Sequence, residues 1–248
     1  MRARAELVAD RGPAGELRLP VQRSQAPLVL RRTADAVYLV SGAAGPLGGD
    51  QLELRIEVRA RARLRLRTVA AAVALPGRSG PESRLTVTAT VGPGARLEYL
   101  PEPTVVADGA RHRTEVAVEL AEDATLLLRD EVLLGRHGER GGRCRTRLRV
   151  NLAGRPLLRH ELDIDGADPA AGGPAVLAGH RAAGTLLTVE PEVADGADGV
   201  WGAGGAADPW VAVMPLAGPG VLVTALAHDT RTLRQRLTPG GRQRQLTA

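Results

Sequence analysis

The chain has 248 residues and a formal net charge of +5, and its Lys/Arg residues are all arginines. A Walker A loop, a pyridoxal phosphate Schiff base and a protein kinase each require a lysine, so the sequence excludes these classes. Aromatic residues make up 2% of the chain, too few to stack on bases, and acids stand between the arginines. We therefore predict solvated strand faces rather than a nucleic-acid partner.

Residues 1 to about 20 carry charges every few positions and no apolar stretch, so we expect no secretory signal. We expect residues 1–16 and 240–248 to fray. The longest apolar run, 221–227, is far shorter than the ~20 residues that span a bilayer. The single cysteine, Cys144, cannot form an internal disulfide, as is typical of the reducing cytosol. These features predict one soluble, cytoplasmic domain over 1–248 with no membrane contact.

Between residues 51 and 162 one local pattern recurs roughly every 30 residues: an alternating apolar run, a short polar or Gly/Pro break, and a second alternating run. The last apolar residues before each break are Val58, Val91, Leu120 and Val150. The corresponding breaks begin at Arg59, Gly92, Ala121 and Asn151. A period of two places the apolar side chains of each run on one face, and a single hairpin cannot bury that face without a neighbour.

This regular period predicts stacked units in a mainly β fold, a β-helix-like stack of repeated strand pairs with about two short helices. An ordinary β-sandwich also gives short strands at even spacing, so both architectures fit the repeat.

The C-terminal third changes character. Gly, Ala, Asp and Pro dominate 165–173 and 194–208, which predicts two long loops around the segment 175–189. A strand is expected at 221–227, followed by a helix over 230–237 that is capped by Asp229 and stopped at Pro239. Trp201 and Trp210 stand in or beside the second loop, either as local packing anchors or as partner-binding residues.

The search for catalytic and metal motifs is mostly negative. His160-Glu161 begins like a zincin helix, but Ile164 replaces the second histidine that zinc requires. Ser41 lacks the preceding glycine of a nucleophile elbow. The five histidines are far apart in sequence and cluster only if the fold brings them together. No tightly bound cofactor and no enzymatic activity are expected.

A series of short motifs in fixed order resembles the UreD (UreH) family of urease accessory proteins over about residues 17–190. The motifs are the Gly-Gly-Asp loop ending at Asp50, the Gly-Pro-Gly-Ala-Arg-Leu-Glu-Tyr-Leu-Pro-Glu segment at 92–102, Asp108-Gly-Ala-Arg, the Gly135-Arg136 turn with Glu139, and Gly-Arg-Pro-Leu at 154–157. Family members typically carry a Thr-Gln and then a Lys-Val-Tyr-like stretch after the first hairpin. Here residues 68–76 are almost wholly apolar, which puts any polar role of that stretch in doubt.

The resemblance implies a non-catalytic maturation factor with a β-helix-like fold. Such a factor binds apo-urease and recruits the helical accessory protein UreF. Through UreF it recruits the GTPase UreG, so that two Ni²⁺ ions reach the urease active site. The missing P-loop agrees with this reading, because GTP hydrolysis then belongs to UreG.

Five carboxylates fall at similar positions of successive repeats and are candidates for a transient nickel path: Asp50, Glu102, Asp108, Glu131 and Glu139. Weak oxygen ligands suit an ion that must be released. If the repeats stack, the loops that bear these acids meet at one rim. Alternatively, the acids are turn residues paired with Arg111, Arg129 or Arg136. Two other functions also stay open, a metal-dependent hydrolase on a β scaffold and a structural β-solenoid interaction protein.

Overall fold

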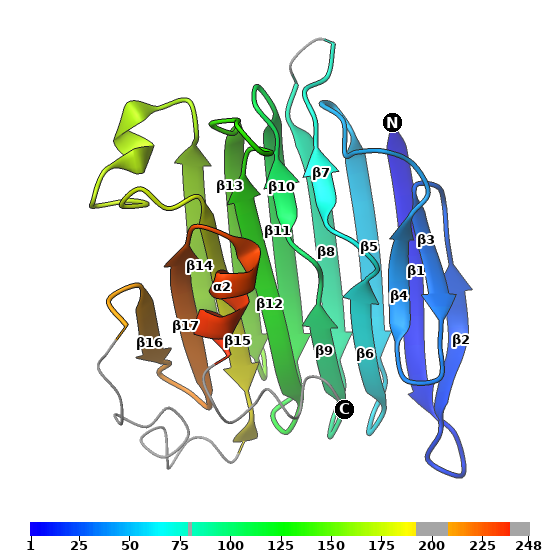
Figure 1. Cartoon of the computed structure of the whole chain (residues 1–248). Helices are drawn as coiled ribbons and strands as arrows, with labels where there is room; N and C mark the ends of the chain where they lie inside the picture. The colour runs from blue at the N-terminus through cyan, green and yellow to red at the C-terminus, as the bar shows by residue number, and fades with distance from the viewer. Residues whose placement is uncertain (79–80, 192–207, 239–248) are drawn as a thin grey trace.

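The structure, a computed structural model, describes residues 1–78, 81–191 and 208–238. Two β-sheets face each other along the length of the molecule (Figure 1). Sheet A has seven strands in the order β14-β13-β11-β8-β5-β1-β2. Its strands are β1 (Arg2–Arg11), β2 (Leu17–Arg23), β5 (Gln51–Val58), β8 (Ser83–Val91), β11 (Arg111–Leu120), β13 (Arg143–Leu152) and β14 (Arg155–Asp165).

Sheet B has ten strands, eight of them in the order β16-β17-β15-β12-β9-β6-β4-β3, with β10 pairing to β12 and β7 to β10. Its strands are β3 (Leu28–Arg32), β4 (Val37–Ser41), β6 (Arg63–Thr68), β7 (Ala72–Ala74), β9 (Arg96–Leu100), β10 (Thr104–Val106), β12 (Thr125–Leu134), β15 (Ala182–Val189), β16 (Val211–Pro215) and β17 (Gly220–Ala227). No helix in the described ranges is long and apolar enough to cross a membrane.

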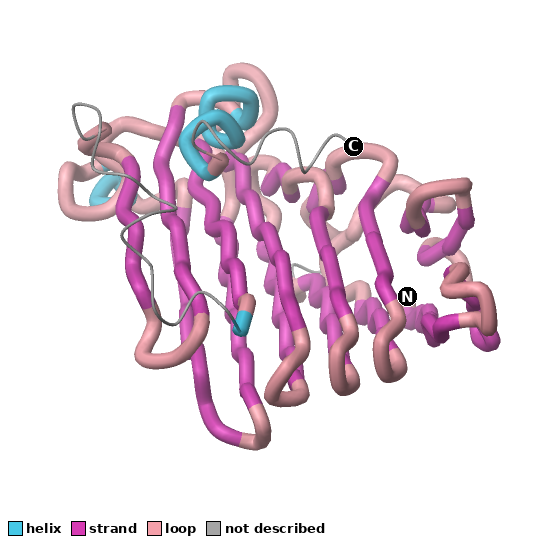
Figure 2. Tube along the Cα trace, turned by 90° about the horizontal axis from the view of Figure 1, so that it is seen from below, coloured by secondary structure: helices cyan, strands magenta, loops and turns pink. Residues whose placement is uncertain are grey.

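The repeat in the sequence is a stack of parallel coils. Val58 of β5 pairs with Val91 of β8, and Val91 pairs with Leu120 of β11, all in parallel register. The second strand of each coil is in register too, because Leu64 of β6 pairs with Leu97 of β9, which pairs with Leu126 of β12. Figure 2 shows the turns between the two layers in a row along the stack. The predicted mainly β, β-helix-like stack is therefore confirmed.

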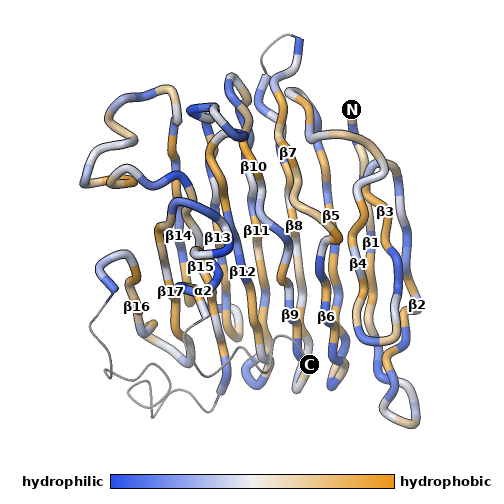
Figure 3. The backbone as a smooth tube through the Cα atoms, viewed as in Figure 1, coloured by the Kyte–Doolittle hydropathy of each residue, from blue (hydrophilic) through white to orange (hydrophobic). Residues whose placement is uncertain are grey.

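The core lies between the two sheets. Strand β5 alternates exposed or half-buried residues with the buried Leu52, Leu54, Ile56 and Val58. These side chains meet Leu64, Leu97 and their equivalents from sheet B in one cluster that runs through the stack. The alternation of polar and apolar residues along the strands is visible in Figure 3. Each coil buries its apolar face only because its neighbours extend the same core.

The fourth repeat differs from its prediction. Leu120 pairs with Leu152, so the anchor in register is Leu152 and not Val150, which pairs with Val118. After Leu152 the chain does not cross to sheet B. Residues Ala153 and Gly154, both with positive φ, form a two-residue turn that sends β14 back antiparallel to β13. Such tight turns close hairpins, and this one ends the stack of coils.

The N-terminal segment also differs from its prediction. Residues 2–11 do not fray but form β1, which pairs in parallel with β5 along its length and antiparallel with β2. Its buried alternating residues include Ala3, Ala5 and Ala9, whose small side chains give a weak apolar signal in the sequence. Residues 240–248, the other segment expected to fray, lie outside the described residues.

The predicted C-terminal elements are present. The segment 175–189 supplies β15, and the strand expected at 221–227 is β17. The one described α-helix, α2 (Thr230–Leu237), has the predicted bounds, and Asp229 caps it by accepting a hydrogen bond from the Thr232 amide at 2.8 Å. A short 3-10 helix, η1 (Pro169–Gly172), stands in the first predicted loop. Helix α2 lies against sheet B through the buried Leu233 and Leu237 (Figure 1).

Candidate functional site

The five candidate carboxylates lie in two separate places. Asp50 precedes β5, and Asp108 and Glu139 precede β11 and β13, so these three stand at the rim where the parallel strands of sheet A begin. Glu102 lies between β9 and β10, and Glu131 lies within β12. The expected meeting of all five at one rim is therefore wrong for Glu102 and Glu131. Both of these lie on sheet B, where α2 covers it.

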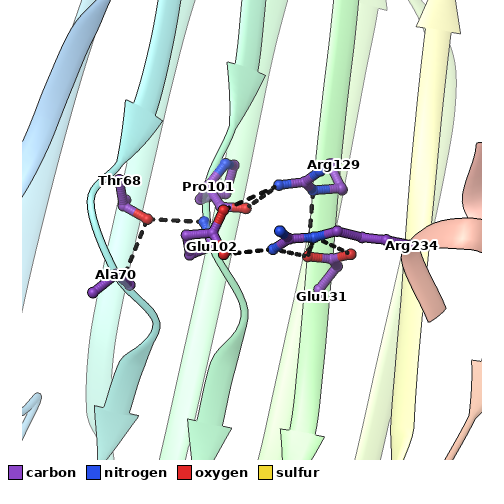
Figure 4. A network of polar contacts seen from close by, with 7 residues as sticks. All are labelled: Thr68, Ala70, Pro101, Glu102, Arg129, Glu131 and Arg234. Atoms are coloured by element: carbon purple, nitrogen blue, oxygen red, sulfur yellow. Dashed lines mark hydrogen bonds and ion pairs between the residues drawn. The ribbon is translucent and has the colours of Figure 1, made fainter. Parts of the chain in front are cut away.

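Glu102 and Glu131 share one guanidinium, that of Arg234 on α2 (Figure 4). Arg234 Nη2 donates to Glu102 Oε2 at 2.7 Å and to Glu131 Oε2 at 2.9 Å. Arg129 Nε lies 3.3 Å from Glu131 Oε2, and Arg129 Nη2 donates to the Pro101 carbonyl at 3.0 Å. We call Glu102, Arg129, Glu131 and Arg234 the quartet. Its two acids and two bases balance in charge.

Because part of the quartet is buried, its ion pairs matter for the stability of the folded protein. The Glu131 side chain is 0% exposed, so its carboxylate depends on the two arginines. Burial lowers the pKa of Arg129, although the nearby Glu131 opposes that shift. Burial also acts to lower the pKa of Arg234, but the hydrogen bonds that its guanidinium donates to Glu131 and Glu102 outweigh this effect and raise that pKa. The quartet thus fastens α2 to β12 with charged groups that are largely withdrawn from water.

The rim holds a second charged group. Glu139 Oε2 accepts hydrogen bonds from the backbone amides of Arg136 at 2.8 Å and Asp108 at 3.2 Å, and Glu139 Oε1 pairs with the Arg136 side chain. The Arg136 guanidinium and these amides lower the pKa of Glu139 to about 2. Arg181 also contacts this loop: its Nη2 donates hydrogen bonds to the carbonyls of Gly135 and Arg136. The loop that bears Glu139 is therefore held from both sides.

Asp50 is buried at the same rim. Its Oδ2 accepts a hydrogen bond from the Leu47 amide at 2.9 Å, and its Oδ1 lies 2.6 Å from the Met1 amino group. The interpretation of these acids as turn residues paired with arginine is supported for Glu139 with Arg136, whereas Glu131 pairs with Arg129 but lies in strand β12. Their part in nickel transit stays a prediction.

Several polar groups between the sheets were missed in the sequence. His112 is buried and hydrogen-bonded on both ring nitrogens, to Ser83 Oγ at 2.9 Å and Thr114 Oγ1 at 3.1 Å. Burial lowers the pKa of His112 to about 4. Alternate residues of a strand lie on one face, so His112 and Thr114 lie on the same face of β11 as the core residues Val116 and Val118. This alternation in the sequence could have identified them as buried polar residues.

Cys144 is buried, and the half-buried Asp130 lies close enough for its charge to act on the thiol. Desolvation raises the pKa of Asp130 to about 6, against a hydrogen bond from Thr146 that lowers it. Desolvation, with a smaller effect of the Asp130 charge, also raises the pKa of the Cys144 thiol. A thiol with a raised pKa is largely protonated and unreactive at neutral pH, so Cys144 acts as a core residue here.

Trp210 packs within the molecule. Its ring centroid lies 4.3 Å from that of His180, which in turn stacks on His228 at 4.4 Å. Trp201 lies outside the described residues. The partner-binding role of both tryptophans stays a prediction. His180 and His228 are the two histidines that the fold brings together, and over the described ranges no group of three or more His, Cys, Asp or Glu side chains could hold a metal ion.

The fold and these charged groups define a β-solenoid-like protein whose buried and rim carboxylates are tied to arginines and backbone amides. Comparison with known proteins agrees with that class. The family model described as UreD urease accessory protein matches residues 1–245. The chain therefore belongs to the UreD family of urease accessory proteins.

Named relatives cover nearly the whole chain. A urease accessory protein UreD of Frankia alni is 47% identical over 96% of this chain and 91% of its own length. Urease accessory protein UreD 3 of Streptomyces griseus is 44% identical over 98% of this chain and 96% of its own length. The UreD of Streptomyces coelicolor is 42% identical over 96% of this chain and 94% of its own length. The family resemblance in the short motifs is thus confirmed.

Proposed function

We propose that this chain is a urease maturation scaffold that binds apo-urease and, with the helical protein UreF and the GTPase UreG, enables nickel insertion into the urease active site. Family membership over residues 1–245 is the observation that carries the proposal. Nickel is cargo in this process, and the chain itself contributes binding surfaces rather than bond-making chemistry.

The shape of the molecule supports a scaffold role. Sheet A presents a long face on which charges of both signs alternate, such as Arg147, which pairs with Glu115 and Glu161 across neighbouring strands. Rigid sheets with paired surface charges suit the docking of large partners, because little side-chain conformational freedom is lost on binding. The quartet fixes α2 on sheet B, the opposite layer.

Complex formation tests the binding part of the proposal. The full chain with an affinity tag is mixed with purified apo-urease and UreF, then with UreG, and each mixture is analysed by size-exclusion chromatography with light scattering. We expect the chain to co-elute with UreF and with apo-urease, and UreG to join only when UreF is present. If the chain elutes separately from both UreF and apo-urease, the proposal is contradicted.

The alternative of a metal-dependent hydrolase is separated by metal analysis of the isolated chain. A hydrolase would hold stoichiometric metal after purification, whereas a scaffold retains none once weakly bound ions are dialysed away.

A further inference from the structure

A cavity of about 320 Å³ opens in sheet B between β4 and β7. Val40 lies on one side of its opening, and the apolar segment 69–73 lies on the other. Its inner end is formed by Leu52 and Leu85 of sheet A and by Tyr99 of sheet B. The cavity therefore leads from the surface into the space between the two sheets.

The cavity reaches well inside the core. Ser83, Leu85 and Val87 point inward from β8, the central strand of sheet A, because alternate residues of a strand share a face. Ser83 and Val87 are 0% exposed, whereas Leu85 between them is half-buried. Leu85 lines the cavity, which accounts for this difference. An engineered apolar cavity of about 150 Å³ takes benzene, so this one can hold a ring system about twice that size.

One buried polar group in the cavity lacks a partner. Tyr99 is 5% exposed and lines the cavity. Its hydroxyl forms no hydrogen bond with residues 1–78, 81–191 or 208–238. Burial, with a smaller effect of the Asp130 charge, raises the pKa of Tyr99, so the hydroxyl keeps its proton and can donate. Because buried tyrosine hydroxyls usually have a partner, this one is available to a molecule in the cavity.

The other titratable groups that line the cavity are already satisfied. Glu102 accepts a hydrogen bond from Arg234, and the Asp50 carboxylate lies 2.6 Å from the Met1 amino group. His112 is hydrogen-bonded on both ring nitrogens, and burial lowers its pKa to about 4, so it is neutral. No unpaired charge among the described lining residues therefore attracts an ion, and burial of an unpaired ion is costly. The cavity favours a neutral molecule.

We propose that the cavity binds a small neutral compound of bicyclic size, with apolar rings between the sheets and one acceptor atom hydrogen-bonded to the Tyr99 hydroxyl. Ligand pockets of about 300 Å³ and above are lined mostly by apolar side chains, and a few polar groups orient the ligand. This cavity has that composition. The proposal concerns the isolated chain and does not depend on the maturation role.

Calorimetric titration of the full chain with quinoline tests the proposal. Quinoline is a neutral bicyclic compound whose ring nitrogen accepts a hydrogen bond. We expect saturable binding to one site per chain. N-methylquinolinium has the same rings but a fixed positive charge and no acceptor, so it should bind at least about tenfold more weakly. Absence of saturable quinoline binding, or equal affinity for the two compounds, would overturn the proposal.

Tyr99→Phe is the decisive variant, because it removes the hydroxyl and keeps the ring. The matched control is Tyr38→Phe, since Tyr38 is the other tyrosine of the chain and does not line the cavity. Tyr99→Phe should weaken quinoline binding by about threefold to tenfold, and Tyr38→Phe should leave it within about twofold. Equal effects of the two substitutions would contradict the proposed hydrogen bond.

Ala72→Phe tests where quinoline binds. Ala72 lines the cavity and shares a face of β7 with the buried Ala74, so a phenyl group there occupies the cavity. This variant should lose quinoline binding. The control is Ala212→Phe at an exposed position of β16, the strand at the other end of sheet B, and it should bind as the wild type does. Undiminished binding to a folded Ala72→Phe variant would place quinoline elsewhere and overturn the proposal.

An aromatic side chain of a partner protein is the other occupant of suitable size. N-acetyltryptophanamide, titrated in the same way, represents such a side chain. We expect it to bind more weakly than quinoline, because its two amide groups lose hydrogen bonds to water in an apolar cavity. Tighter binding of N-acetyltryptophanamide, abolished by Ala72→Phe, would assign the cavity to a partner's side chain, and the small-molecule proposal would be wrong.

Discussion

Arg234 on α2 and Glu131 on β12 stand 103 positions apart, yet the guanidinium of the first donates to both carboxylate oxygens of the second. This pair makes the C-terminal helix part of the stack, because it ties the last described element to a central strand.

Replacement of Arg234 by alanine should destabilise the protein by about 2 kcal/mol, because it leaves the buried Glu131 with Arg129 alone. Urea unfolding measures the change, and hydrogen exchange should show faster exchange of α2 amides. Arg231→Ala, at an exposed position of the same helix, is the control and should change stability by less than about 0.5 kcal/mol. Equal losses in the two variants would mean that the quartet does not hold α2.

Asp130 should make the protein less stable as pH rises from about 4 to 6. The pKa of its carboxyl is 3.8 ordinarily and about 6 in the folded chain, so the folded state binds this proton more tightly than the unfolded state does. The unfolding free energy therefore falls through that window and stays lowered above it. Asp130→Asn should raise stability at pH 7.5 by about 1 to 2 kcal/mol and abolish this part of the pH dependence.

The measurement for Asp130 is the difference in urea midpoint between wild type and variant at a series of pH values. Taking the difference cancels the opposite trend of carboxylates such as Asp163, whose pKa is lowered to about 2 and whose contribution is lost only in acid. A difference that does not change with pH would contradict the assignment.

The turn that ends the coils should depend on the backbone of Gly154. Its φ is +73° and no atom lies within 4 Å of the position that a Cβ would take, so Gly154→Ala tests conformation alone. We expect a loss of about 1 kcal/mol in unfolding free energy. Gly172→Ala is matched, because the space there is also open but φ is not in the left-handed region, and it should be close to neutral. Thermal unfolding of both variants measures these changes, and equal stability losses in the two would contradict the role of the Gly154 backbone.

The nickel-path prediction calls for substitutions that preserve side-chain shape, because Glu102 also belongs to the quartet and Glu139 holds the rim loop. Changing Glu102 and Glu139 to glutamine and Asp108 to asparagine removes charge but retains side-chain shape. We expect lower nickel occupancy of urease after maturation with the triple variant, while a pull-down shows an intact complex. The control neutralises three acids on the outer face of sheet A, Glu57, Glu119 and Glu161. Normal nickel loading with the first triple variant would leave the chain as a scaffold only.

Much of the fold was predictable because the signals are local. The alternation before each break fixes the strands, and Asp229 followed by a short helical segment fixes α2. The fourth repeat was not predicted, since its end depends on a change of turn length, from a longer break to the two residues Ala153 and Gly154. Strand β1 was missed because alanines supply much of its buried face.

The charged sites were less predictable. Glu131 was expected in a loop at the rim, but the alternation of Leu126, Leu128 and Val132 already places it in a strand, on the face opposite to the core. Its partner Arg234 comes from the far end of the chain, and no local pattern links the two. The pairing of Glu139 with Arg136 is the opposite case, because the two are three residues apart in one turn.

The most direct test of the maturation role is the nickel content of urease. Apo-urease is incubated with Ni²⁺, UreF, UreG and GTP, with and without this chain, and urease is then re-isolated for nickel analysis by mass spectrometry and for activity. The account predicts nickel-loaded, active urease only when the chain is present. Equal nickel content and activity in its absence would contradict it.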